Sequence, residues 1–142
     1  MSVTLNPYLS FRDNAREAME FYKTVFGGEL TLNTFGETPG SSSEPSDADK
    51  IMHGQLDGEN GITLMGSDTP KHMDPGGDIV NATAISLSGD DDAALRGYWE
   101  MLTDGGDVQQ PLVTAPWGDS FGMCADRFGV NWMVNISGSG PA

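Results

Sequence analysis

Apolar residues recur at every third or fourth position in two stretches of the chain, as they do along the buried face of a helix. In the first stretch the apolar positions are Ala15, Ala18, Met19, Tyr22, Val25 and Phe26. Asn14 and Glu17 have the spacing of a capping box, in which two side chains satisfy the first backbone amides of a helix. Because Gly27 and Gly28 disfavour continuation, the pattern predicts a helix between Asn14 and Gly27.

The second amphipathic stretch has its apolar positions at Ala94, Leu95, Tyr98, Met101 and Leu102. An acidic run at residues 90–92 precedes it, and carboxylates at this end of a helix cap it and interact favourably with its dipole. Gly105 and Gly106 follow the last apolar position. We therefore predict a second helix between the acidic run and Gly105.

Shorter segments that are compatible with β-structure surround both helices. They are residues 7–11, 29–35, 51–56, 62–65, 82–87, 108–113, 121–125 and 130–136. Two polar stretches that contain proline and glycine, residues 37–50 and 67–78, are predicted to be loops. Residues 57–61 have the composition of a hairpin turn.

The second half of the chain repeats the order of elements in the first. Pairs of residues that match in this alignment include Ser10 with Ser86, Gln55 with Cys124, Asp57 with Asp126, and Met65 with Met133. A half of about 70 residues would hardly be stable alone, so the halves should share an interior. The sequence predicts one α+β domain over residues 1–142, built from two βαβββ modules at about residues 3–67 and 80–137.

The charge of the chain excludes several classes of function. Seven Lys and Arg residues face twenty-one Asp and Glu residues, which gives a formal net charge of −14. Such a surface repels nucleic acids and anionic membranes, so neither is an expected partner. The acidic residues fall mainly in turns, caps and loops, which favours an acidic coat over an acidic ligand site. Whether the acidity reflects habitat or ligand stays open.

Cysteine content and hydropathy suggest a location. The single cysteine, Cys124, can form no internal disulfide and no Cys-x-x-Cys zinc pair. The N-terminal segment has no basic region followed by a long apolar run, and no segment reaches the ~18 apolar residues that a membrane helix needs. We expect a cytoplasmic protein.

Several segments carry a resemblance to a known family: residues 14–22 (NAREAMEFY), 26–28 (FGG), 52–53 (MH), 57–58 (DG) and 117–132. The chain resembles the vicinal oxygen chelate superfamily, which includes glyoxalase I, extradiol dioxygenases and the bleomycin and fosfomycin resistance proteins. Within it, the chain is most similar to the PhnB-like branch. The resemblance implies that the paired βαβββ modules form a curved mixed sheet shaped as a cup, with helices outside and a ligand inside.

The resemblance also implies where a metal would bind. In metal-using members four ligands come from the first and last strands of the modules, and the corresponding positions here are Asn6, Met65, Ala82 and Met133. None of these is His, Glu or Asp, the donors that divalent metals need. We therefore expect no metal, and glyoxalase or dioxygenase chemistry is disfavoured. Some PhnB-like proteins carry a methyltransferase name, but no Gly-x-Gly-x-x-Gly follows a strand, so no cofactor is expected.

Strand alternation suggests which residues face the interior of the cup. If Met52 and Leu56 face a helix, His53 and Gln55 point the other way. His53 is the candidate catalytic residue, as a general base or a ligand contact, because an imidazole exchanges protons near neutral pH. A histidine that only forms a hydrogen bond across the sheet is the alternative interpretation.

The same reasoning nominates further ligand-binding residues. They are Tyr8, Ser10 and Ser86 by alternation, Cys124 by its match to Gln55, Met65 and Met133 as an adaptable apolar wall, and Trp117 as a floor or lid. The serines, Cys124 and the methionines have ordinary alternatives, which are filler, an inert half-buried thiol and normal core, respectively. Trp132 is predicted to pack under a helix, and His72 to be exposed.

The leading hypothesis is a metal-free small-molecule-binding protein with a ligand cavity inside the cup, acting as a homodimer. An enzymatic version would use His53 as acid or base, with Tyr8 or Ser10 orienting the substrate. One alternative is a drug- or metabolite-sequestering protein of the bleomycin-resistance type. A metal-dependent lyase or dioxygenase is disfavoured, and a regulatory protein with a closed cup is a further possibility.

Overall fold

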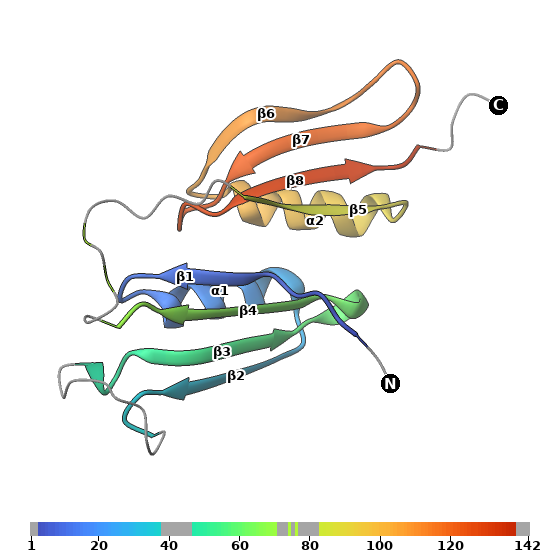
Figure 1. The fold of residues 1–142 in the computed structure, drawn as a ribbon. Helices are drawn as coiled ribbons and strands as arrows, with labels where there is room; N and C mark the ends of the chain where they lie inside the picture. The colour runs from blue at the N-terminus through green and yellow to red at the C-terminus, as the bar shows by residue number, and fades with distance from the viewer. Residues whose placement is uncertain (1–2, 38–46, 71–73, 75, 77–82, 139–142) are drawn as a thin grey trace. The chain divides into compact units, whose positions relative to one another are not determined.

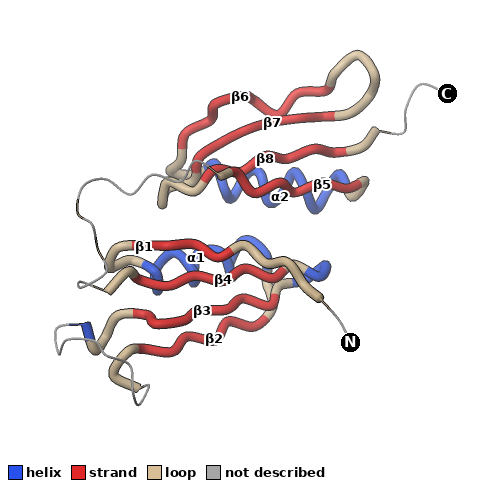
Figure 2. The backbone as a smooth tube through the Cα atoms, viewed as in Figure 1, coloured by secondary structure: helices blue, strands red, loops and turns tan. Residues whose placement is uncertain are grey.

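The computed structural model describes residues 3–37, 47–70, 74, 76 and 83–138 (Figure 1). The chain divides into two compact units, Met1–Ile79 and Val80–Ala142. Each unit contains one four-stranded mixed sheet and one α-helix, and the order of elements in each is strand, helix and three strands (Figure 2). The predicted α+β class and the pair of βαβββ modules are confirmed.

In the first unit the strand order is β1-β4-β3-β2. Strand β1 runs parallel to β4, whereas β4, β3 and β2 pair antiparallel. A short 3-10 helix, η2 (Glu59–Gly61), joins β3 to β4. The elements are β1 (Tyr8–Phe11), α1 (Ala15–Phe26), β2 (Glu29–Thr34), β3 (Ile51–Asp57) and β4 (Thr63–Asp68).

The second unit has the same topology, with the strand order β5-β8-β7-β6. Strand β5 is parallel to β8, and the other neighbours are antiparallel. The elements are β5 (Ala84–Gly89), α2 (Asp92–Thr103), β6 (Asp107–Thr114), β7 (Ser120–Ala125) and β8 (Asn131–Ile136). As the acidic run predicts, the Asp91 side chain caps α2, accepting a hydrogen bond from the Ala94 amide at 3.1 Å.

Helix α1 packs closely against its sheet because two glycines lie beneath it. A Cβ atom on Gly66 would lie 3.2 Å from the sulfur of Met19, and one on Gly54 would lie 3.4 Å from a carbon of the same side chain. The apolar face of α1 is fully buried, as its periodicity predicts. The buried helix residues are Ala15, Ala18, Met19, Tyr22, Val25 and Phe26.

In the second unit, Trp132 is fully buried, and its indole Nε1 donates to Asp126 Oδ2 at 2.8 Å. The other carboxylate oxygen of Asp126 accepts from the backbone amides of Phe128 and Val130. Since these amides belong to the turn before β8, Asp126 joins that turn to the core. A cluster under α2 is formed by Leu95, Val134 and Ile136, with Leu87, Tyr98, Trp99 and Leu112 packed against it.

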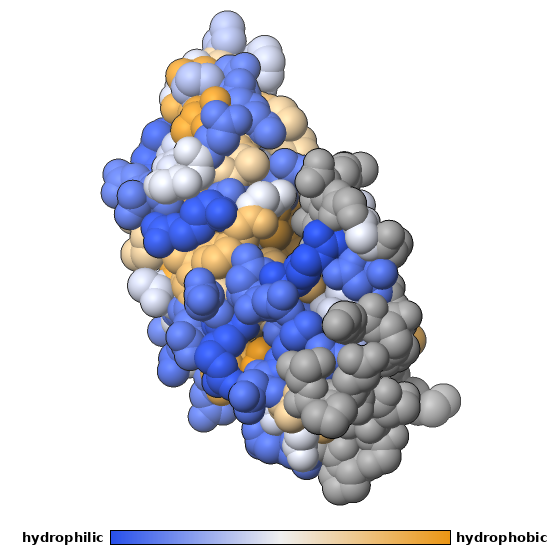
Figure 3. Space-filling model, turned by 90° about the vertical axis from the view of Figure 1, so that its left-hand side faces the viewer, coloured by the Kyte–Doolittle hydropathy of each residue, from blue (hydrophilic) through white to orange (hydrophobic). Residues whose placement is uncertain are grey.

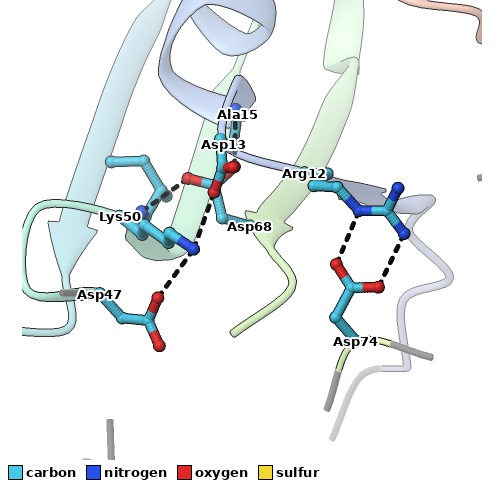
Figure 4. A network of polar contacts seen from close by, with 8 residues as sticks. Arg12, Asp13, Ala15, Asp47, Lys50, Asp68 and Asp74 are labelled. Carbon is cyan, nitrogen blue, oxygen red and sulfur yellow. Dashed lines mark hydrogen bonds and ion pairs between the residues drawn. The ribbon is translucent and has the colours of Figure 1, made fainter. Parts of the chain in front are cut away.

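The predicted capping box at Asn14 is wrong. The Asn14 side chain makes no capping hydrogen bond, and the amide of Ala15 instead donates to Oδ1 of Asp68 at 2.9 Å (Figure 4). The other oxygen of Asp68 accepts from the amide of Ile51, also at 2.9 Å. A buried carboxylate at the end of β4 therefore holds the start of α1 and the start of β3 together.

Ion pairs connect the chain around this carboxylate. Lys50 Nζ lies 2.8 Å from Asp13 and 2.7 Å from Asp47, and hydrogen bonds to these two carboxylates raise the pKa of Lys50 (Figure 4). Arg12 donates through Nε and Nη2 to both oxygens of Asp74, at 2.6 and 2.7 Å. The Arg12 guanidinium, followed by the Gly76 amide, lowers the pKa of Asp74.

Candidate functional site

Each sheet has one face covered by the helix of its own unit; we refer to the opposite side as the helix-free face. In the first unit, Leu9 and Leu56 are buried against α1, so alternation turns Tyr8, His53 and Gln55 to the helix-free face. In the strand register, Met65 lies between Tyr8 on one side and Gln55 on the other. Four of the candidate residues are therefore neighbours on one surface, and Ser10, on the same side of β1, is exposed.

A line of hydrogen bonds runs across this face from β1 into β3. Tyr8 Oη lies 3.2 Å from His53 Nδ1, His53 Nε2 lies 3.5 Å from Gln55 Oε1, and Gln55 Nε2 lies 3.2 Å from Asp57 Oδ1. The two rings are tilted by 39°, with their centroids 5.7 Å apart. We call Tyr8, His53, Gln55 and Asp57 the polar chain.

The direction of each hydrogen bond follows from the one before it, starting at the carboxylate. An ionised carboxylate only accepts, so the Gln55 amide nitrogen donates to Asp57 and the amide oxygen accepts from His53 Nε2. A neutral imidazole with its proton on Nε2 has a lone pair on Nδ1, which accepts from the phenol of Tyr8. The polar chain thus holds one tautomer of His53.

Asp57 was not among the residues predicted from sequence. The sequence pattern places it in the turn, although its position two residues after Gln55 is the signal by which strand alternation indicates its side of the sheet. Strand β3 extends to Asp57, which places this carboxylate at the end of the row formed by His53 and Gln55.

In the second unit, the helix-free face carries Ser86 opposite Met133, and Met133 opposite Met123. A pocket of about 320 Å³ opens in this unit, at the turn between β6 and β7. Trp117, at this turn, is 65% exposed and contributes to the lining. The residues that line the pocket are Gln110, Val113, Ala115, Trp117, Asp119, Phe121 and Asn135.

The predicted position of Cys124 on the ligand side of the sheet is wrong. Cys124 is fully buried and lies opposite Trp132, on the face of β7 that α2 covers. The strand register makes Met123 the counterpart of Gln55, because these two residues lie opposite Met133 and Met65 respectively. The sequence alignment was one residue out of register here, and a one-residue shift moves a side chain to the other face.

Burial also makes Cys124 unreactive. Desolvation, with a smaller contribution from the negative charge of Asp126, raises the pKa of the thiol to about 11. At pH 8 the folded protein should therefore resist alkylation by iodoacetamide, whereas the same protein in 8 M urea, as the control, should be alkylated to completion. Mass spectrometry of the intact chain measures this, and equal rates in the two conditions would contradict the assignment.

The residues at the metal positions implied by the superfamily do not suit a divalent ion. Met65 and Met133 offer thioethers, Asn6 lies before β1, and Ala82 and the second histidine, His72, lie outside the described residues. Thioethers are weak donors for zinc, magnesium or ferrous iron. Among residues 3–37, 47–70, 74, 76 and 83–138, no group of three His, Cys, Asp or Glu side chains is placed to hold a metal.

The acidic residues lie mostly on the surface. On the side of the molecule drawn in Figure 3, hydrophilic residues surround smaller hydrophobic areas. Most of the described Asp and Glu residues are exposed, and the buried ones are Asp47, Asp68 and Asp126. No helix in the described part of the chain is long and apolar enough to cross a membrane.

Comparison with known proteins agrees with this architecture. The sequence model of the Glyoxalase/Bleomycin resistance protein/Dioxygenase superfamily matches residues 4–134, so the chain belongs to this superfamily. The protein PA1353 from Pseudomonas aeruginosa is 40% identical to it, with a TM-score of 0.81 and coverage of 96% of this chain and 98% of that one.

Two further proteins are similar to the chain. The protein YjdN of Escherichia coli (strain K12) is 27% identical over 140 residues, which cover 93% of this chain and 94% of YjdN. A structure from Bacillus cereus, described as a putative 3-demethylubiquinone-9 3-methyltransferase and PhnB protein, is 19% identical, with a TM-score of 0.69 and coverage of 95% and 100%. It shares the fold. The predicted superfamily is confirmed, with PhnB-like proteins among the structural neighbours.

Proposed function

We propose that this protein binds a small, largely apolar organic molecule, without a metal, in the pocket beside Trp117. The observation that carries the proposal is the pocket itself: about 320 Å³, with aromatic and aliphatic walls from Trp117, Phe121 and Val113. Ligand sites of this kind combine apolar walls with a few polar groups that orient the ligand. Gln110, Asp119 and Asn135 are the polar groups in this lining.

A sequestering role, in which the bound molecule is held and not converted, is the second candidate. It corresponds to the sequestering members of the superfamily. Asp119 is the one titratable side chain among the described residues of the lining. With a formal net charge of −14, the protein as a whole attracts cations. Both features favour capture of a cationic or neutral molecule over an anion.

Calorimetric titration with two matched probes tests the proposal: 9-aminoacridine, a planar cation, and anthracene-9-carboxylate, an anion with the same three-ring frame. We expect the cation to bind more tightly, with an advantage that shrinks as salt is added. Trp117→Ala should weaken binding of the cation about tenfold or more, because an aromatic wall is lost.

Val108→Ala is the matched control, since Val108 is an exposed residue of β6 outside the pocket lining. It should leave the affinity unchanged. Equal affinities for the Trp117→Ala and Val108→Ala variants would exclude this pocket as the ligand site. Tighter binding of the anion would contradict the inference that the charge of the protein favours a cationic ligand.

A further inference from the structure

The polar chain in the first unit contains a phenol and an imidazole, two groups that can serve in acid–base catalysis. Tyr8 is half exposed, so its phenol oxygen is open to a molecule that approaches the helix-free face. The same oxygen lies 3.2 Å from His53 Nδ1, within reach for a proton to pass between them. Nothing in a purely apolar ligand site requires a phenol and an imidazole in this contact.

We propose that Tyr8 and His53 form a proton-abstracting pair for a weakly acidic organic substrate. Tyr8 Oη takes a proton from the substrate as its own proton moves to Nδ1 of His53. The substrate X–H bond breaks and a new Oη–H bond forms, while the old Oη–H bond breaks and an Nδ1–H bond forms. The electron pair stays on X, and the products are the substrate anion and an imidazolium.

The other two members of the polar chain are positioning residues. Gln55 accepts from Nε2–H of His53, which keeps the Nδ1 lone pair directed at Tyr8. Asp57 orients the Gln55 amide by accepting from its nitrogen, and it places a negative charge on the same strand as the imidazolium that forms. On β2, Glu29 lies opposite Asp57 and is a further acidic residue at this end of the sheet.

The Tyr8–His53 pair is independent of the pocket beside Trp117, since the four members of the polar chain all come from β1 and β3 and none of them lines that pocket. A failure of the probes to bind at Trp117 would not affect the pair, and loss of proton transfer would not affect the pocket. The variants at Tyr8 and at Trp117 therefore separate the two proposals.

The test uses 5-nitrobenzisoxazole, a small carbon acid. Removal of its C–H proton forms a nitrile, breaks the N–O bond and releases a coloured nitrophenolate, with no further reactant. With the full chain we expect a rate above that of buffer. Because a positioned acid–base group contributes roughly a hundredfold or more, His53→Gln and Tyr8→Phe should each lower kcat/KM about a hundredfold.

His72→Gln is the matched control, since the chain has two histidines and His72 is outside the polar chain. Its rate should equal that of the natural protein, and thermal unfolding of each variant checks that it is folded. A wild-type rate no higher than that of His53→Gln overturns the proposal. A Tyr8→Phe variant with full activity overturns the relay through the phenol.

Nitrogen NMR of the imidazole distinguishes a positioning role of Gln55 from a merely structural one, because only the positioning role changes the tautomer of His53. In the His72→Gln background the single remaining histidine should show a protonated Nε2 and an unprotonated Nδ1 in its neutral form. Gln55→Leu should give a mixture of tautomers and a lower kcat with KM little changed. A neutral ring with its proton on Nδ1 in the unsubstituted polar chain would overturn the proposal.

Discussion

Gly28→Ala is expected to destabilise the protein by about 3 kcal/mol, a large part of the stability of a small domain. Gly28 follows α1 and has a φ of +89°, a backbone conformation that costs other residues about 1–2 kcal/mol. A Cβ atom there would overlap the carbonyl oxygen of Asp57 and lie 2.6 Å from Cα of Gly58. Backbone atoms cannot rotate away as a flexible side chain can, so the unit must deform.

Gly61→Ala is the control for the conformational part of this effect. Gly61 also has a positive φ, +74°, but nothing lies within 4 Å of the position its Cβ would take. We expect this variant to lose only about 1 kcal/mol, since strain of the backbone is its one cost. Urea unfolding of both variants measures the difference, and equal losses would show that close packing at Gly28 contributes nothing.

Asp68→Ala is expected to cost about 3 kcal/mol, because it leaves two buried amides, of Ala15 and Ile51, without their acceptor. Asp68→Asn keeps the shape of the side chain and one acceptor oxygen, so we expect about half of this loss. Urea unfolding measures both effects through the midpoint at constant slope.

Asn14→Ala, at the same end of α1, is the matched control. The Asn14 side chain makes no capping hydrogen bond, so its removal should change the free energy of unfolding by no more than a few tenths of a kcal/mol. A loss of about 1 kcal/mol in Asn14→Ala, together with a small loss in Asp68→Ala, would show that Asn14 caps α1, as the sequence predicts.

The helices and most strands could be predicted because their signals are local. The apolar periodicity of α1 and the acidic residues before α2 depend on neighbours in the chain, and both helices begin and end close to the predicted positions. The cap of α1 could not be predicted, because Asp68 lies 53 residues away from the amide that it accepts from. Asn14 and Glu17 do have the local pattern of a capping box, but a tertiary contact, from Asp68, caps the helix instead.

Some residues of the candidate site could be predicted and one could not, because strand alternation is a local signal and strand register is not. Alternation placed Tyr8, His53 and Gln55 on one side of the sheet, and the structure brings them into contact. The prediction for Cys124 is wrong because the match of Asp57 with Asp126 sets the repeat one residue away from the register that the strand pairs define. The ligand, the homodimer and the cytoplasmic location stay predictions.

The two caps imply different folding routes for two modules of the same topology. Helix α2 is capped by Asp91, three residues before the amide it accepts from, so its first turn can form before any strand has paired. The cap of helix α1 forms only when β4 is in place, because this contact closes a loop of 53 residues and costs the corresponding chain entropy. The capping contact of the second module therefore has the lower contact order. We infer that α2 forms before α1 when the chain folds.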